Sequence, residues 1–209
     1  MIRSELLFQI LALPYEMLTR HPVWERHCAQ MATELPAGAR RVVDLGCGPG
    51  NSTTHLRDVV GPGVVGADYA RAMLRRAHRR DGRLPLVCAD ASALPMRSGS
   101  LDAVTFHSVL YLLPDRAGAL AEVARALRPG GRAVLLEPQS GARANLLGLA
   151  RALPTPHWAL TATCWKTMAS VYGGFQRGEL GTALTHAGLR VIKLEEALGG
   201  LGLLAVAER

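Results

Sequence analysis

Cysteine is scarce in this chain, and the few thiols form no recognisable pattern. The 209 residues contain four cysteines, none of them in a C-x-x-C pair or beside paired histidines. This argues against both a zinc site and a disulfide framework, so we expect reduced thiols and no bound metal.

Long apolar runs are missing as well. The longest one near the N-terminus, Leu6–Leu13, contains Gln9 and is far shorter than the ~20 residues needed to cross a bilayer. The sequence shows no cleavage pattern typical of a signal peptide. We therefore expect a cytoplasmic protein without a transmembrane segment, and peripheral contact with a membrane stays open.

Lysine is nearly absent, although the formal net charge is +7. Among the 24 basic residues only Lys166 and Lys193 are lysines. The densest arginine cluster falls in a segment with a helical pattern, which places Met73 and Leu74 toward the core and the charges toward water. Such a face is either simply solvated or binds an anionic partner, such as RNA or an anionic lipid surface. The cluster consists of Arg71, Arg75, Arg76, Arg79, Arg80 and Arg83.

Short apolar strands alternate with amphipathic helices along the chain. This alternation predicts an α/β fold with a parallel sheet, and the length suits one domain. We find no internal repeat, low-complexity tract or long linker. The oligomeric state is left open by the sequence.

A glycine-rich turn follows the first strand, in the segment Arg41-Arg-Val-Val-Asp-Leu-Gly-Cys-Gly-Pro-Gly-Asn-Ser-Thr54. Alternate glycines let a ligand approach bare backbone, and the helix that begins after them offers free N–H groups. Dinucleotides and S-adenosylmethionine both bind at such turns, but the dinucleotide fingerprint G-x-G-x-x-G has a later third glycine. Asp44 ends the strand, where its carboxylate would repel a pyrophosphate and attract the α-ammonium of S-adenosylmethionine.

The run DLGCGPG closely resembles motif I of the class I S-adenosylmethionine-dependent methyltransferases. The resemblance continues through GADYA, ADASALPMRSGSLD and LRPGG, covers about residues 35–209, and is greatest with the small-molecule branch, methyltransferase type 11, which includes ubiquinone and menaquinone biosynthesis methyltransferases. It implies a Rossmann-like seven-stranded, mostly parallel sheet with an antiparallel last strand and helices on both faces. It also implies S-adenosyl-L-methionine as cofactor and S-adenosyl-L-homocysteine as product. The motif I residues expected at the cofactor are Asp44, Gly46, Cys47, Gly48 and Gly50.

Two further acids follow at the ends of the next strands. The second strand, Gly63–Asp68, ends in a carboxylate that can accept both ribose hydroxyls, and Tyr69 can lie against the adenine. In the resembled family an Asp-Ala pair after strand three, here Asp90 and Ala91, holds the adenine edge. Asp102 begins strand four and is expected to be structural.

The rest of the chain supplies the remaining elements of the sheet. A Pro-Gly-Gly turn is expected to end one helix and return the chain to strand five. The last two strands should pair as an antiparallel hairpin. The expected elements are strand 101–106, helix 117–127, strand 132–137, helix 177–187, and strands 191–195 and 203–207.

We expect a single methyltransferase domain over residues 1–209. A helical lid over residues 1–35, divided into short helices at Pro14 and Pro22, would cover the acceptor, although a static cap is the alternative. The other parts are a cofactor-binding core (36–137), a helical insertion on the substrate side (138–175), and a closing helix and hairpin (176–209).

All three tryptophans lie in the flanks of the core, at Trp24, Trp158 and Trp165. Aromatic side chains with polar handles suit the lining of a partly apolar acceptor pocket, and ordinary packing of peripheral helices is the alternative.

The implied reaction is a direct in-line displacement onto a small-molecule or lipid-like acceptor. Since a sulfonium is already a good leaving group, catalysis consists mostly of alignment and desolvation. A base is needed only if the nucleophile must lose a proton. His107, at the end of strand four, is the candidate base and also a cofactor neighbour, and Tyr111 and His157 are weaker candidates.

Three alternatives remain at this point. The net charge favours an RNA-modifying methyltransferase, but strand four ends in Phe-His-Ser-Val rather than Asn/Asp-Pro-Pro-Tyr, and no Pro-Cys pair is present to act on cytosine, so nucleic acid is disfavoured as a partner. A non-catalytic S-adenosylmethionine-binding protein would carry the same motifs. An NAD-dependent oxidoreductase is disfavoured by the glycine spacing.

Overall fold

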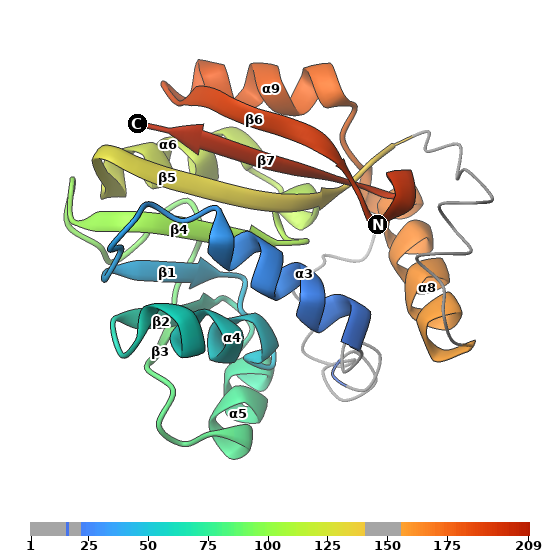
Figure 1. Ribbon diagram of the computed structural model, residues 1–209, viewed down its shortest axis with the longest axis horizontal. Helices are drawn as coiled ribbons and strands as arrows, with labels where there is room; N and C mark the ends of the chain where they lie inside the picture. The colour runs from blue at the N-terminus through green and yellow to red at the C-terminus, as the bar shows by residue number, and fades with distance from the viewer. Residues whose placement is uncertain (1–15, 17–21, 141–155) are drawn as a thin grey trace.

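A seven-stranded sheet runs through the molecule (Figure 1). The computed structural model describes Glu16, residues 22–140 and residues 156–209. Within these ranges the strands are ordered β3-β2-β1-β4-β5-β7-β6. They are β1 (Val42–Leu45), β2 (Val64–Asp68), β3 (Leu86–Cys88), β4 (Leu101–His107), β5 (Leu127–Pro138), β6 (Arg190–Ala197) and β7 (Gly202–Glu208).

The last strand alone in this sheet runs against its neighbours. The pairs β1–β2, β1–β4, β2–β3 and β4–β5 are parallel, whereas β7 is antiparallel to both β5 and β6. This is the predicted sheet, including the antiparallel last strand. Because parallel strands end at a common edge, the loops after β1, β2, β3 and β4 are brought together there.

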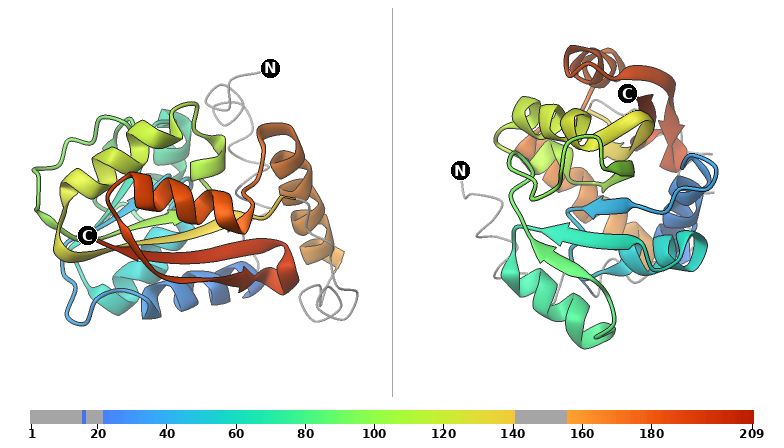
Figure 2. Two further views of the ribbon diagram at one scale, coloured as in Figure 1. Left: turned by 90° about the horizontal axis from the view of Figure 1, so that it is seen from above. Right: turned by 90° about the vertical axis from the view of Figure 1, so that its left-hand side faces the viewer.

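Helices cover both faces of the sheet, as predicted. Figure 2 shows α6 (Arg116–Ala126) and α9 (Arg177–His186) on one side and α3 (Pro22–Thr33) on the other, where α4 (Asn51–Val60) also packs. The helix α5 (Arg71–Arg80) contacts β2 and β3 at one edge of the sheet. The helix α8 (Pro156–Tyr172) contacts β5 and the short 3-10 helix η1 (Leu110–Leu112) that follows β4. A second 3-10 turn, η2 (Leu198–Gly200), joins β6 to β7.

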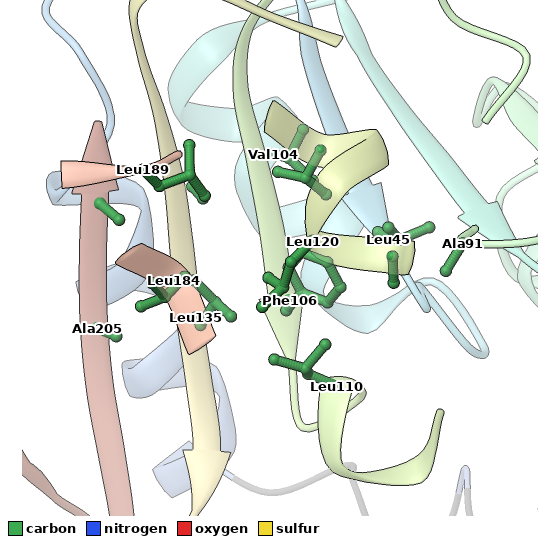
Figure 3. Close-up of a cluster of buried hydrophobic side chains, with 14 of the residues drawn as sticks. Leu45, Ala91, Val104, Phe106, Leu110, Leu120, Leu135, Leu184, Leu189 and Ala205 are labelled. Atoms are coloured by element: carbon green, nitrogen blue, oxygen red, sulfur yellow. The ribbon is translucent and has the colours of Figure 1, made fainter. Parts of the chain in front are cut away.

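Each face of the sheet has its own apolar core. Figure 3 shows the cluster beneath α6 and α9, where Phe106 of β4 and Leu135 of β5 lie against Leu120 and Leu184. The opposite cluster joins α3, α4 and α8 to the sheet, and its members include Trp24, Met31, Leu56, Val134 and Trp165. The central strands β1, β4, β5 and β7 are therefore buried on both sides, which explains their continuous apolar runs.

Asp102 has the structural role expected from its position at the start of β4. Its carboxylate accepts hydrogen bonds from the backbone N–H groups of Arg40 and Arg41, both at 2.9 Å. The guanidinium groups of Arg41 and Arg128 also donate to it, at 3.1 and 2.6 Å. The Asp102 side chain thereby connects the residues just before β1 to the start of β5.

The predicted flanks are described only in part. The helix α3 begins at Pro22, as the His21-Pro22 break predicts, and its buried side chains Trp24, Cys28 and Met31 pack against the core. This packing joins the described part of the expected lid to the core, and both the mobile lid and the static cap stay predictions. Residues 1–15 and 17–21 of the lid segment and the expected helix 144–153 lie outside the described residues. Among the described helices, none is both long and apolar enough to cross a membrane.

Candidate active site

The turn between β1 and α4 needs its glycines for conformation and for space. Gly46, Gly48 and Gly50 have φ values of 72°, 54° and 82°, in the left-handed region that favours glycine. A Cβ at Gly46 would lie 2.3 Å from Cγ2 of Val109, so no side chain fits there. Gly50 is the N-cap of α4. The turn is therefore shaped by close contact with the loop after β4.

Asp44 is fully buried behind this turn. One carboxylate oxygen accepts from the hydroxyls of Ser52 and Thr53, both at 2.6 Å, and the other accepts from Thr105 at 2.9 Å. Burial raises the pKa of Asp44, and the three hydroxyl hydrogen bonds oppose that rise. With no exposed surface, Asp44 is not placed for the direct contact with a ligand ammonium that the sequence suggested. It instead fastens the first turn of α4 to β1 and β4.

Asp68 connects the glycine turn to the end of β2. Its Oδ2 accepts from the backbone N–H of Gly48 at 2.9 Å, and its Oδ1 accepts from that of Ala70 at 2.7 Å. Burial raises the pKa of Asp68, whereas the two backbone hydrogen bonds lower it. A carboxylate oxygen has further lone pairs, so Asp68 can still accept from a ligand.

A cavity of about 150 Å³ opens at the common edge of the strands. Six of the ten residues predicted at the cofactor line it: Gly46, Gly48, Asp68, Tyr69, Asp90 and Ala91. The other walls come from Met73 of α5 and from the loop after β4, which sequence patterns left without a role. Those loop residues are Ser108, Val109, Leu112, Leu113, Pro114 and Asp115.

The residues after β2 and β3 form one end of this cavity. Asp90 accepts from the backbone N–H and the hydroxyl of Ser92, at 2.8 and 2.7 Å, which fixes its carboxylate. Ala91 is buried next to it, and Tyr69 is 52% exposed at the rim. Carboxylates that alternate with apolar side chains suit a nucleoside, because its hydroxyl and amino groups donate while its base is flat and apolar.

A much smaller cavity, of about 20 Å³, lies on the other side of the glycine turn. It shares Gly46 and Gly48 with the larger cavity and is also lined by Cys47 and His107. Gly50 lines neither cavity, so its contribution is the geometry of the turn. Eight of the ten predicted residues thus line two adjoining cavities, and Asp44 and Gly50 line neither.

His107 lies against Trp24 in the wall of the small cavity. Its ring is stacked on Trp24 with 4.2 Å between centroids, and its Nδ1 is 3.2 Å from Sγ of Cys28. The Nε2 atom is buried without a hydrogen-bond partner among the described residues. The pKa of His107 is lowered to about 3, mainly by burial and to a smaller extent by the charges of His27 and His55. The imidazole is therefore neutral near pH 7.

Trp165, from the C-terminal flanking helix α8, also packs at the end of β4. Its Nε1–H donates to Oγ of Ser108, and its ring meets Trp24 edge-on at 6.1 Å between centroids. Ser108 is one of the few non-glycine residues with positive φ, at 65°. Both tryptophans are less than a tenth exposed, and Trp24 lines the small cavity. The side chains of Trp158 and His157 lie outside the described residues.

Tyr111, the weaker candidate base, is placed elsewhere. Its side chain is 3% exposed and belongs to the core beneath α6, and it lines neither the larger nor the smaller cavity. A general base must reach the proton that it removes. This placement argues against a catalytic role for Tyr111.

Glu137 helps to shape the site, and the sequence patterns did not predict this role. It is fully buried at the end of β5, and its carboxylate accepts from the backbone N–H groups of Val109, Leu110 and Tyr111, at 3.0, 2.8 and 3.2 Å. Burial raises the pKa of Glu137 to about 7 against the effect of these hydrogen bonds. It holds the loop that lines the larger cavity, and an acid at the end of a predicted parallel strand was the signal available for it.

Comparisons with known proteins agree with this geometry. A family model described as a methyltransferase domain matches residues 43–135. A demethylmenaquinone methyltransferase of Thermus thermophilus is 39% identical over 127 residues, which are 57% of this chain and 57% of the relative. Its counterpart in Beutenbergia cavernae is 37% identical over 138 residues, 65% of this chain and 53% of the relative. The chain therefore spans about half the length of these curated relatives.

The fold is shared with solved structures over the whole chain. The protein solved in complex with the Haloferax volcanii Trm112 methyltransferase activator has a TM-score of 0.71 at 21% identity. The match covers 100% of this chain and 97% of that one. This likeness confirms the predicted fold. The methyltransferase-domain model agrees with the family predicted from the motifs over residues 43–135.

Proposed function

We propose that this chain, which belongs to the class I S-adenosylmethionine-dependent methyltransferases, transfers a methyl group from that cofactor to an apolar small-molecule acceptor. The observation that carries the proposal is the gathering of Gly46, Gly48, Asp68 and Asp90 around one cavity, from the ends of three neighbouring strands. The two glycines let a ligand approach the backbone closely, and the two carboxylates can accept hydrogen bonds from the hydroxyl and amino groups of the cofactor.

The residues around the larger cavity fit the adenosine part of the cofactor. Asp68 is held by two backbone N–H groups and keeps lone pairs for ribose hydroxyls. Asp90 and Ala91 are positioned to meet an adenine edge, and the apolar side chains of Val109 and Leu112 can cover its face. A pyrophosphate, by contrast, would have to enter a space lined by the carboxylates of Asp68, Asp90 and Asp115, which disfavours NAD.

When bound, S-adenosylmethionine supplies a methyl group on a sulfonium, and the protein then contributes alignment and exclusion of water. The aromatic cluster of Trp24, His107 and Trp165 is suited to the second task, because it packs the end of β4 under two flanking helices. The hydrogen bonds from the loop after β4 to Glu137 keep that loop in one position.

His107 is the chain's candidate for handling a proton of the acceptor. When Nδ1–H donates to the sulfur of Cys28, Nε2 carries a lone pair that no described residue satisfies. A base with a pKa of about 3 takes a proton only weakly at neutral pH. We therefore infer that His107 orients a hydroxyl group or an acidic carbon of the acceptor.

The acceptor class rests on the lining of the site and on the names of the relatives. The small cavity beside His107, the residue proposed to meet the acceptor, is bounded by the aromatic ring of Trp24. The curated relatives are named as methyltransferases of demethylmenaquinone, an apolar quinone. A reduced quinone or a similar ring with a hydroxyl group is the acceptor that we propose to test first.

Two measurements test this function. Calorimetric titration should show binding of S-adenosylhomocysteine and none of NAD, and tight NAD binding without a response to S-adenosylhomocysteine would overturn the assignment. Incubation with radiolabelled S-adenosylmethionine and a short-chain demethylmenaquinol should then label the quinone. Label confined to the RNA fraction of a cell extract would favour the RNA-modifying alternative. Cofactor binding without label in any fraction would favour a non-catalytic binding protein.

A further inference from the structure

Most of the net charge of the protein is concentrated in α5 and the turn after it. Residues 71–83 contain six arginines and one acid, Asp81, which gives +5 of the formal +7. The helix itself has no acidic residue in its sequence RAMLRRAHRR. Like charges this close repel one another, so the arrangement lowers stability unless an anionic partner offsets it.

The arginines of α5 point away from the core. Met73 and Ala77 are buried on the sheet side of the helix, whereas Arg71, Arg75, Arg79 and Arg80 are exposed. We call these four residues the arginine face. Two other arginines are already paired, one with Glu16 and one with Asp81. Within the described ranges no carboxylate forms a salt bridge with the arginine face.

This face adjoins the rim of the larger cavity. Tyr69, Ala70 and Met73, which lead into the first turns of α5, line that cavity. Tyr69 is 52% exposed there, and the tyrosine side chain is suited to an interface between water and an apolar phase. Figure 1 shows α5 at the outer edge of the sheet beside β3, clear of the layer formed by α6 and α9.

We propose that the arginine face docks on an anionic lipid surface. Guanidinium groups bind phosphate oxygens in a bidentate manner, and clusters of basic residues on an amphipathic helix bind anionic lipid headgroups. Docking would bring the cavity rim at Tyr69 to the membrane, where an apolar acceptor is dissolved. This last step rests on the proposed function, whereas the docking itself does not.

The surroundings of the arginine face favour lipid over RNA. Proteins that bind single-stranded nucleic acid interleave basic residues with aromatic side chains on which bases stack. In residues 71–83 there is no phenylalanine, tyrosine or tryptophan, and no asparagine or glutamine that could read a base edge. Tyr69 stands at the cavity rim instead.

The test compares binding to vesicles of phosphatidylcholine with and without about 30% phosphatidylglycerol, at ~50 mM and ~300 mM NaCl. The chain should sediment only with the anionic vesicles, and less at the higher salt. The variant Arg75→Gln/Arg79→Gln/Arg80→Gln should bind about 100-fold more weakly, since each arginine near such a surface contributes ~1 kcal/mol and 1.4 kcal/mol is tenfold.

A matched control removes the same charge elsewhere. The exposed residues Arg26, Arg40 and Arg97, replaced together by glutamine, should leave vesicle binding within about threefold of the parent chain, because the arginine face itself stays intact. Equal losses in both triple variants would overturn the specific role of α5 and leave only a net-charge effect. If the α5 triple variant lost binding to a single-stranded RNA oligonucleotide but bound vesicles like the parent chain, the arginine face would be assigned to RNA instead.

The docking proposal and the methyltransferase proposal fail in different ways. If the α5 variant binds S-adenosylhomocysteine and methylates a water-soluble acceptor like the parent chain but no longer acts on an acceptor in anionic vesicles, both proposals stand. Absence of vesicle binding by the parent chain, together with methyl transfer to the soluble acceptor, would refute the docking proposal alone. Vesicle binding without methyl transfer would refute the function alone.

Discussion

The imidazole of His107 lies flat against the indole of Trp24, with 4.2 Å between the ring centroids and 4° between the ring planes. The first residue ends β4, and the second belongs to α3, which precedes the sheet in the chain. Their contact removes the histidine from water and couples its protonation to the folding of the flank.

Folding stability should therefore depend on pH through His107. Its folded pKa, about 3, lies below the ordinary value of 6.5, so the folded state binds fewer protons and the stability from neutral His107 is lost as pH falls below about 6.5. At about pH 5 the loss is about 2 kcal/mol. Urea denaturation of the parent chain and of His107→Phe, which keeps an aromatic ring against Trp24, measures the difference. A constant gap between the two chains from about pH 5 to pH 8 would contradict the buried neutral state.

Glu137 should change the pH dependence of folding stability in the direction opposite to His107. Its folded pKa, about 7, lies above the ordinary 4.5, so the folded state binds more protons, and the associated stability is present at low pH and lost as pH rises through about 7. The full loss is about 3 kcal/mol. Between about pH 5 and 6.5 the two slopes oppose each other, which flattens the profile of the parent chain. The variant Glu137→Gln should lose this component and show stability that rises with pH, and a profile that keeps the parent shape would count against it.

Gly46→Ala should abolish cofactor binding through a clash rather than through a lost contact. The new Cβ would lie 2.3 Å from Cγ2 of Val109, at a residue with φ of 72°. The double variant Gly46→Ala/Val109→Gly removes the whole colliding side chain, including the Cβ of Val109 that would lie 2.9 Å from the new Cβ. It should recover part of the affinity for S-adenosylhomocysteine, leaving a backbone penalty of about 1–2 kcal/mol. Calorimetric titration of the parent chain, the single variant and the double variant with S-adenosylhomocysteine measures this recovery. No recovery of affinity in the double variant would show that the collision with Val109 is not the cause.

Asp68→Ala should weaken binding of S-adenosylhomocysteine by about 1–3 kcal/mol, because it leaves the N–H groups of Gly48 and Ala70 and the ribose hydroxyls without their acceptor. The chain should still fold, since the side chain lies at a cavity and not in an apolar core. Asp58→Ala, an exposed acid on α4 away from this cavity, is the matched control and should bind normally. An unchanged dissociation constant in Asp68→Ala would remove this residue from the site.

The part of the site that sequence patterns predicted well is the part controlled by strand ends. Asp68, Tyr69, Asp90 and Ala91 line one cavity because each follows a parallel strand, and neighbouring parallel strands end at the same edge. Local spacing alone was enough to place them. The glycine turn was predictable for the same reason, since positive φ and close approach are properties of a few adjacent residues.

Burial is what only the tertiary structure decided. Asp44 was expected at the ligand, but hydroxyls of α4 and β4 enclose its carboxylate. Tyr111 was expected near the acceptor, but η1 turns it into the core. These outcomes depend on which side of a loop faces an element that is distant in the chain, and no local pattern encodes that.

By itself, the amino-acid sequence determined the family, the order of strands and helices, and the residues at the strand ends. Only the tertiary structure brought Trp24 and Trp165 from opposite flanks onto the end of β4, and Glu137 under the loop that follows it. The physical reason is the distance along the chain over which each property is determined. Backbone conformation and apolar periodicity are set by neighbours in sequence, whereas the protonation of His107 and Glu137 is set by the packing of segments far apart in the chain.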